Sequence, residues 1–385
     1  MIDVKKALLS LYPNFLDKYP MFITNTILAF LRALFHENEI NNFLIKNKDI
    51  SNIEFIEKVL EYFNFTYKVS NRDIENIPSS GKVVIISNHP LGALDSLCLL
   101  SMISKVRGDV KIVANEVLMQ FDHIKDLLLP VDNMNNKSTK DSIKESLQSL
   151  NNEEAIILFP AGEVSRVRPV GIKDTKWKNG FLKFAKKTNS PILPIYIHAR
   201  NSWFFYFVSM IYKPAATLLL VHEMFNKYNK SIEIKVGEMI PIQNINLQSV
   251  EKKSEINLLK KHLYRISRGK NGIFATQTCI SHPENRQLLK DELSNSQLLG
   301  ITKDNMKIYL CAYVQDSSII REIGRLREYT FRKVGEGTGK KRDIDEYDTY
   351  YKHLVLWDDS KLELVGAYRI GEANTIMASD KLDDG

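Results

Sequence analysis

The sequence predicts an α/β fold: a mostly parallel sheet flanked by helices, preceded by an N-terminal helical segment and followed by a smaller α+β unit. Three apolar runs carry the prediction of the sheet, at residues 83–86, 155–159 and 192–197. They show no alternation of polar and apolar residues, which is typical of parallel strands covered on both faces. Helical patterns lie between them. A strand, a helix and two further strands after residue 307 predict the smaller unit.

We expect four segments along the 385 residues: a helical segment at 1–75, a large α/β domain at 76–275, a polar linker at 276–307 and the smaller unit at 308–385. A chain of this length can hold two domains with sizeable cores. Residues 21–35 are apolar, but Arg32 interrupts them, and they are shorter than the roughly 20 residues of a spanning helix. They predict an amphipathic helix that lies either in a membrane interface or against the large domain.

The formal net charge is +7 and is spread along the chain. A mildly basic surface is compatible with an anionic membrane or an acidic carrier protein. The sequence shows no zinc finger, basic arm or aromatic RNA-binding block, which argues against nucleic acid. Cys98, Cys279 and Cys311 form neither a metal spacing nor an even disulfide set, so we expect a reducing cytoplasm. No signal peptide is expected.

The first candidate site follows the run at 83–86. There Asn-His-Pro-Leu-Gly at 88–92 breaks the strand, and an apolar helix begins with Asp95 in its first turn. His89 therefore leaves the carboxyl end of a strand beside a carboxylate, at the edge where open α/β sheets place their active sites. Such a pair can take a proton from a hydroxyl. Because no Gly-x-Ser-x-Gly nucleophile is present, the pair suits direct attack by a substrate hydroxyl on an acyl donor. On this pair alone, a turn histidine and a helix N-cap remain the alternative.

A second turn, Phe-Pro-Ala-Gly-Glu-Val-Ser-Arg at 159–166, follows the next apolar run. Together with the histidine motif and Pro-Ile-Leu-Pro-Ile-Tyr-Ile at 191–197, it resembles the glycerolipid acyltransferase superfamily over roughly residues 75–245. The resemblance implies an acyltransferase in which His89 is the general base and Asp95 orients it. It also implies an acceptor or oxyanion site formed by Asn88, Gly162, Glu163, Ser165 and Arg166.

Departures from the family pattern point to one of its branches. Five residues separate His89 from Asp95, one more than in the family's motif, and Ala161 stands at the family's acidic position, two residues before Glu163. These features look like the branch that acylates lyso-aminolipids, often labelled putative hemolysin. The block near residue 132 also lacks the family's arginine. We therefore expect an aminolipid acceptor, with Arg166 holding the carboxylate of an N-acyl amino acid.

Two further stretches are candidates for contact with lipid or carrier protein. The aromatic residues at 203–212 either line an acyl groove, lie at a membrane interface or pack in the core. The lysines at 173–187 flank Trp177 and Phe181. They form either a solvated face or a docking surface for an acidic acyl carrier protein.

The smaller unit resembles the ornithine–acyl-carrier-protein N-acyltransferase family, which has an N-acetyltransferase-like fold. The resemblance covers roughly residues 308–385 and rests on Arg-Leu-Arg-Glu-x-x-Phe-Arg-x-x-Gly-Glu-Gly from Arg325, Asp-x-Asp at 343–345 and Val-Gly-Ala-Tyr-Arg at 365–369. It implies substrate binding by Arg327, Arg332 and Glu336. The donor-binding part of that fold is not found in the sequence, so we expect this unit to be partial or inactive.

Both resemblances predict an O-acyltransferase. It would move a fatty acyl group from an acyl carrier protein or coenzyme A thioester to the hydroxyl of a lyso-aminolipid of the ornithine or glycine type. Two alternatives stay open: acylation of a lysophospholipid, 1-acylglycerol-3-phosphate, and a non-catalytic, membrane-associating hemolysin-like protein. We expect no bound cofactor and no metal, since neither motif gathers a ligand cluster. We expect a cytoplasmic protein, peripheral on the inner membrane.

Overall fold

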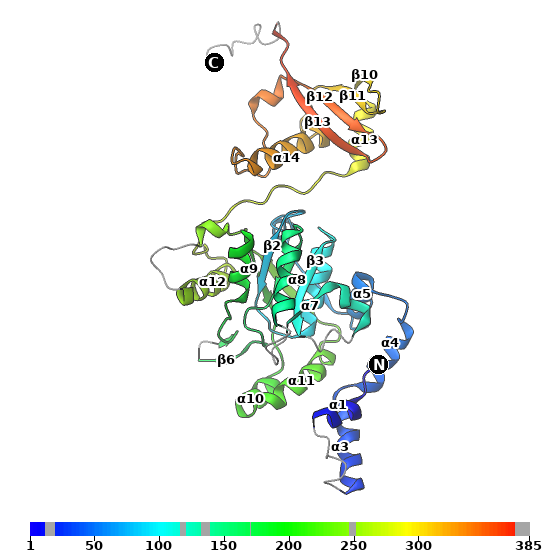
Figure 1. The fold of residues 1–385 in the computed structure, drawn as a ribbon, viewed down its shortest axis with the longest axis vertical. Helices are drawn as coiled ribbons and strands as arrows, with labels where there is room; N and C mark the ends of the chain where they lie inside the picture. Colours follow the sequence, from blue (N-terminus) through cyan, green and yellow to red (C-terminus); the bar gives the residue numbers. More distant parts are fainter. Residues whose placement is uncertain (12–19, 116–120, 132–138, 170, 246–251, 374–385) are drawn as a thin grey trace. The chain divides into compact units, whose positions relative to one another are not determined.

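The computed structural model describes residues 1–11, 20–115, 121–131, 139–169, 171–245 and 252–373, and it divides into two compact units (Figure 1). The first is Met1–Thr276 and the second is Gln277–Gly385. The linker predicted at 276–307 is wrong, because this segment contributes a helix and a strand to the second unit. The segment is mostly polar, but its Leu289 and Leu293 are buried in the second unit's core.

A seven-stranded sheet forms the centre of the first unit, in the order β1-β9-β8-β2-β5-β3-β4. Every neighbouring pair is parallel except β8 and β9. The mostly parallel sheet is thus confirmed, and the three predicted apolar strands, β8, β2 and β5, are neighbours in it. The strands are β1 (Thr66–Lys68), β2 (Val83–Ser87), β3 (Val110–Asn115), β4 (Leu128–Val131), β5 (Ala155–Leu158), β8 (Ile192–His198) and β9 (Ser231–Val236).

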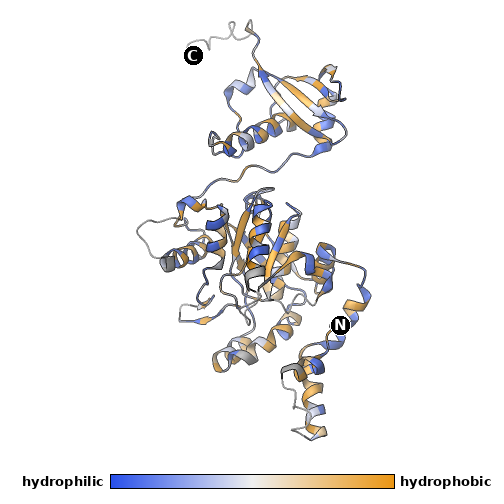
Figure 2. Ribbon diagram, viewed as in Figure 1, coloured by the Kyte–Doolittle hydropathy of each residue, from blue (hydrophilic) through white to orange (hydrophobic). Residues whose placement is uncertain are grey.

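Helices cover both faces of this sheet, which explains why its central strands are apolar throughout (Figure 2). Val83 and Ile85 of β2 face one core, whereas Val84 and Ile86 face the other, as the two-residue repeat of a strand requires. Residues of α5 (Asn52–Tyr62) and α7 (Ala93–Ser104) complete the first core. Residues of α8 (Thr139–Asn151), α9 (Gly180–Thr188) and α12 (Lys252–Ile266) complete the second.

Apart from a 3₁₀ turn whose Ile242 belongs to the second core, the remaining elements of the first unit lie outside the two cores or between their strands in the sequence. A 3₁₀ helix at Asp122–Leu127, the geometry favoured in short connectors, lies between β3 and β4 in the sequence. The other elements are α1 (Val4–Leu11), α3 (Met21–Leu34), α4 (Glu37–Lys46), α6 (Asn71–Ile74), the hairpin β6 (Arg166–Arg168) and β7 (Gly171–Lys173), α10 (Trp203–Ile211), α11 (Lys213–Phe225) and a 3₁₀ turn at Ile242–Asn244.

The apolar N-terminal helix α3 is largely uncovered. It buries only Thr24 and Leu28 among its described residues, while Met21, Phe22 and Phe30 are exposed. Packing against the large domain, one of the two predicted alternatives, therefore accounts for a small part of its surface. Within the described ranges, every helix falls short of the length and apolar character that crossing a membrane demands.

The second unit contains a four-stranded antiparallel sheet in the order β10-β11-β12-β13. Its core joins Val355 and Trp357 of β12 to apolar residues of both helices. The predicted strand, helix and hairpin are confirmed as β11, α14 and β12–β13. The elements are α13 (Arg286–Ser294), β10 (Gln297–Ile301), β11 (Lys307–Cys311), α14 (Ser318–Lys333), a 3₁₀ turn at Glu346–Thr349, β12 (Lys352–Asp358) and β13 (Glu363–Ile370).

Candidate active site

The two predicted motifs lie at the carboxyl ends of adjacent strands. β2 and β5 pair in parallel, so the chain leaves both at the same edge of the sheet. The backbone N–H of Ser165 donates to the carbonyl of His89 (2.7 Å), which joins the two loops directly. Gly92 has φ +93° and Gly162 has φ +66°, conformations that L side chains rarely adopt. Glycine at these positions allows both loops to turn sharply.

His89 and Asp95 form a close pair at this edge. Nδ1 of His89 lies 3.2 Å from Oδ2 of Asp95, and the His89 side chain is 17% exposed whereas Asp95 is fully buried. Oδ2 also accepts the N–H groups of Leu91 (2.7 Å) and Gly92 (3.0 Å). The contact to Nδ1 is not aligned as a hydrogen bond, and Oδ1 of Asp95 has no partner among the described residues. With Nδ1 turned to Asp95 and the ring stacked on Phe159 (3.9 Å between centroids), Nε2 is the nitrogen that remains for a substrate.

The electrostatic setting of Asp95 suits proton transfer. Burial raises the pKa of its carboxyl, while the His89 side chain and the N–H groups of Leu91 and Gly92 oppose that rise. A positive imidazole next to it favours the ionised carboxylate, so the pair gains stability when His89 takes up a proton. The arrangement can therefore act as a general base without a protein nucleophile.

The second loop brings Arg166 and Glu163 to the same edge. Nη1 of Arg166 donates to Oγ of Ser209 (2.7 Å), its guanidinium lies over the Phe205 ring (5.3 Å), and its Nε is 3.8 Å from Glu163. Lys213 lies 4.0 Å from the other oxygen of Glu163. Burial lowers the pKa of Arg166, and only 7% of its side chain is exposed. Arg166 thus has little free surface, and its role as anchor of the acceptor stays a prediction.

Two predicted acceptor or oxyanion residues hold the loops in place. Oδ1 of Asn88 accepts the N–H of Ile197 (2.7 Å), and its Nδ2 donates to the Ile197 carbonyl (2.9 Å). The N–H of Gly162 donates to the carbonyl of Phe159 (2.9 Å). Because these groups are already bonded, Asn88 fastens the first loop to β8, and the Gly162 N–H closes the turn of the second loop.

Sequence reasoning missed two buried residues that contact these loops. Nδ2 of Asn201 donates to the carbonyl of Pro90 (3.0 Å), and Asp174 accepts a hydrogen bond from Ser165 (2.6 Å). The Asn201 contact joins residues far apart in the sequence, whereas Ser165 and Asp174 flank the short hairpin of β6 and β7. The only local signal was Trp177, three residues after Asp174, because an indole N–H usually finds a partner when it is buried.

Across the described ranges, no three His, Cys, Asp or Glu side chains come together in a way that could hold a metal ion. The chemistry that the site can perform with its own residues is proton transfer by His89.

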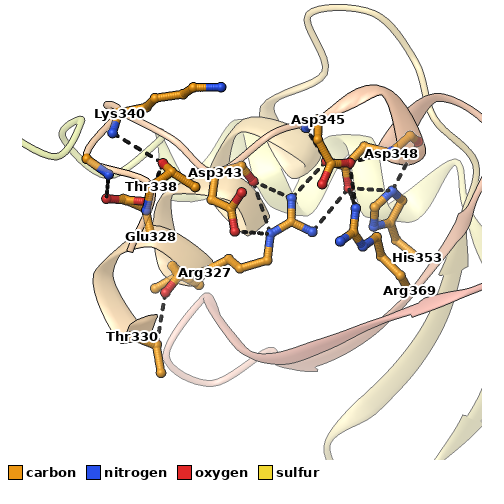
Figure 3. Close-up of polar contacts among 12 residues, drawn as sticks. Arg327, Glu328, Thr330, Thr338, Lys340, Asp343, Asp345, Asp348, His353 and Arg369 are labelled. Atoms are coloured by element: carbon orange, nitrogen blue, oxygen red, sulfur yellow. Dashed lines mark hydrogen bonds and ion pairs between the residues drawn. The ribbon is translucent and has the colours of Figure 1, made fainter. Parts of the chain in front are cut away.

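In the second unit, Arg327 and Arg332 lie in ion-pair networks, and Figure 3 shows the contacts of Arg327. Nη2 of Arg327 binds Asp348 (2.8 Å), and Nη2 of Arg332 binds the fully buried Glu328 (2.6 Å). Glu336 is exposed. The structure therefore gives both arginines internal contacts, and the substrate-binding role implied for the three residues stays a prediction.

The comparison with protein families agrees with this geometry. The model of the family described as "Acyltransferase" matches residues 13–272, more than half of the chain and both loops of the site. This chain belongs to the acyltransferase family. A second model, the "Acetyltransferase (GNAT) domain", matches residues 326–383 in the second unit. The chain is thus an acyltransferase with a GNAT-like unit at its C-terminal side.

Curated relatives match the acyltransferase unit and the GNAT-like unit separately. Over 64% of this chain, it is 31% identical to the "Lyso-glycine lipid O-acyltransferase" of Bacteroides thetaiotaomicron and 30% identical to that of Phocaeicola vulgatus, covering 90% and 88% of those proteins. A second B. thetaiotaomicron protein, "Glycine N(alpha)-acyltransferase", is 45% identical over 23% of this chain, and the match spans 28% of that protein. Among solved structures, the 1-acyl-sn-glycerophosphate (LPA) acyltransferase PlsC of Thermotoga maritima matches with a TM-score of 0.36 and 18% identity, covering 62% of this chain and 95% of that one.

Proposed function

We propose that this chain transfers a fatty acyl group from an acyl carrier protein or coenzyme A thioester to the hydroxyl of a lyso-glycine lipid. The His89–Asp95 pair carries the proposal, because it places a partly exposed base at the carboxyl end of β2 in a member of the acyltransferase family. Two relatives are named lyso-glycine lipid O-acyltransferases, which supports glycine over ornithine as the head group. Lysophosphatidic acid is the acceptor of the competing proposal.

In the proposed reaction, Nε2 of His89 takes the proton of the acceptor hydroxyl while the hydroxyl oxygen attacks the thioester carbonyl. Asp95 stabilises the imidazolium formed in this step. The tetrahedral intermediate then collapses: the C–S bond breaks, and the leaving thiolate receives the proton from the imidazolium. The backbone N–H groups of Ala161 and Glu163 are the proposed donors to the oxyanion.

The acceptor's carboxylate is proposed to lie beside the second loop, near Arg166 of that loop and Lys213 at the start of α11. Both cations border Glu163, at 3.8 and 4.0 Å. Burial weakens solvent screening around Arg166, so its charge acts more strongly on a nearby carboxylate than a surface arginine would. A single carboxylate carries less charge than a phosphate, which fits a site where Glu163 already offsets part of the positive charge.

We also infer that the acyltransferase unit binds a lipid surface through α10 and α3. α10 buries Phe205 and Tyr206 but exposes Trp203, Phe204, Phe207, Met210 and Ile211. Part of the aromatic stretch is therefore core, and the rest is an uncovered apolar face of the kind that binds partners or membranes. α3 adds the exposed Met21, Phe22 and Phe30. Changing Phe204 and Phe207 to Ser is expected to weaken sedimentation with phospholipid vesicles about tenfold, whereas changing the exposed Leu298 and Leu299 of the second unit is not.

The proposed reaction is tested with the purified chain, acyl carrier protein or coenzyme A charged with labelled fatty acid, and three acceptors offered separately. These are lyso-glycine lipid, lyso-ornithine lipid and lysophosphatidic acid. His89→Ala is expected to lower kcat about 10²- to 10⁴-fold. His198→Ala is the matched control, because it removes an imidazole from the end of neighbouring β8, where the ring packs on Tyr196.

Label in the O-acylated glycine lipid, lost in His89→Ala and kept in His198→Ala, would establish the proposal. Label only in the ornithine lipid would change the head group, and label only in phosphatidic acid would favour the competing proposal. A folded chain that transfers no acyl group to any acceptor would overturn it.

A further inference from the structure

We propose that Asp174 is a positioning residue of this active site, which sets the place of His89 by holding its peptide and Ser165 together. The inference rests on the proposed O-acyl transfer and deepens it, because it names a residue on which the general base depends. Asp174 follows β7 directly and is 2% exposed. It belongs to neither sequence motif.

The carboxylate of Asp174 accepts three hydrogen bonds. Oδ1 accepts the hydroxyl of Ser165 (2.6 Å) and the backbone N–H of His89 (3.3 Å), and Oδ2 accepts the indole N–H of Trp177 (2.9 Å). The Ser165 N–H in turn donates to the His89 carbonyl (2.7 Å). His89, Ser165 and Asp174 thus form a closed ring of hydrogen bonds that spans both catalytic loops.

Asp174 is itself held from α12. Its N–H donates to the hydroxyl of Tyr264 (2.9 Å), and Nζ of Lys260 donates to the carbonyls of Asp174 (2.8 Å) and Thr175 (2.7 Å). Burial, and then the charge of Asp174, raise the pKa of Tyr264, so its hydroxyl keeps its proton. Since α12 packs on the second core of the sheet, these contacts tie the His89 peptide to a rigid part of the unit.

A carboxylate so placed acts on the reaction through geometry. General-base catalysis needs the imidazole within hydrogen-bond reach of the acceptor hydroxyl, and a misplacement of about 1 Å costs about 100-fold in rate. Asp174 is 2% exposed and its carboxylate is bonded within the protein, so we expect the acceptor not to contact it. Its loss should therefore lower kcat about 100-fold and change KM little.

The first test compares Asp174→Ala with Glu255→Ala in the full chain. Glu255 is a matched control, because it is a buried acid on α12 whose carboxylate binds Lys186 (2.9 and 3.1 Å) and contacts neither loop. Both variants lose a buried carboxylate. After kcat is corrected for the fraction of the chain that is folded, it should be lowered only in Asp174→Ala. Equal losses that follow the folded fraction would overturn the proposal.

A second variant tests the bonds themselves. In Asp174→Asn, one side-chain oxygen still accepts from His89 and Ser165, but the new NH₂ group faces the indole N–H of Trp177. Trp177→Phe removes that opposed donor. We expect kcat of the double variant to exceed that of Asp174→Asn alone, a coupling that a merely volume-filling role would not produce.

The placement of His89 is also measured without the reaction, from the imidazole resonances of ¹⁵N-histidine protein assigned with His89→Gln. We expect the His89 signals to shift in Asp174→Ala and to stay in Glu255→Ala. Unmoved signals would overturn the role of Asp174 even if the wild type is active. Shifted signals in a chain that transfers no acyl group would support Asp174 while the proposed function fails.

Discussion

Asp95 in the first unit and Glu328 in the second are both fully buried, yet their surroundings move their pKa values in opposite directions. Burial raises the pKa of Asp95 above its usual value, and two backbone N–H groups and His89 only partly oppose it. Burial also acts on Glu328, but hydrogen bonds from Thr338, shown in Figure 3, and from Arg332 outweigh it and lower the pKa. Burial alone thus does not distinguish a carboxylate that takes part in proton transfer from one that holds the fold. The two carboxylates differ in their contacts: Oδ1 of Asp95 has no hydrogen-bond partner among the described residues, and the partly exposed His89 lies beside it.

The largest expected effect follows from changing Asp95 to Asn. An amide has nearly the same shape but cannot stabilise the imidazolium with a negative charge, so kcat should fall about 10⁴-fold. This corresponds to a rise of about 5 kcal/mol in the activation free energy. Single-turnover acyl transfer measures the loss, and the unfolding transition shows whether the unit stays folded. The matched change, Glu328→Gln, should leave acyl transfer intact. If both changes lower the rate alike, the comparison of the two carboxylates is broken.

The next effect concerns the stability of the second unit. Arg332→Met leaves Glu328 buried without its guanidinium, and removing one partner of a buried pair costs about 3–5 kcal/mol. Hydrogen exchange should speed up in α13 and α14 but not in β2, because each unit has its own core. Arg286→Met is the control, since its pair with Glu363 lies at the surface and contributes less than about 1 kcal/mol. Unchanged exchange in Arg332→Met would show that Glu328 does not need its partner.

The smallest expected effect concerns the pH dependence of folding stability at His262, a buried histidine of α12. Burial, and then the charge of Arg265, lower the pKa of His262 to about 4, and its Nδ1 accepts the N–H groups of Ile273 (2.9 Å) and Phe274 (3.2 Å). Between pH 6.5 and about 4 the unfolded chain binds a proton here that the folded chain does not. Folding stability supplied by neutral His262 is therefore complete above pH 6.5 and is lost as the pH falls to about 4, by up to about 3 kcal/mol.

His262→Asn checks this sign, because its Oδ1 can accept the same two N–H groups and does not titrate. Urea unfolding of the wild type and the variant at a series of pH values measures the difference. The wild type should lose more stability than the variant across this window. Parallel curves would show that His262 does not carry the acid sensitivity.

The sequence determined those parts of the protein that depend on neighbours along the chain. The residues of β2, β5 and β8 are apolar throughout because both faces of the sheet are covered, and that pattern is legible without a structure. His89 and Asp95 were found for a similar reason. Six positions apart, on either side of a turn that Gly92 permits, they meet through local geometry alone.

Only the tertiary structure decided which side chains hold that pair in place. The contacts of Asn88 with Ile197 and of Asp174 with His89 join residues from separate segments, and no local pattern encodes them. The polar segment at 276–307 was misjudged for the same reason, because Leu289 and Leu293 are buried in a core that they share with residues of α14, β11 and β12. Likewise, α10 has one face in the core and one uncovered, a division set by what packs against it. Local spacing thus specifies the reacting groups, and long-range packing specifies their positions.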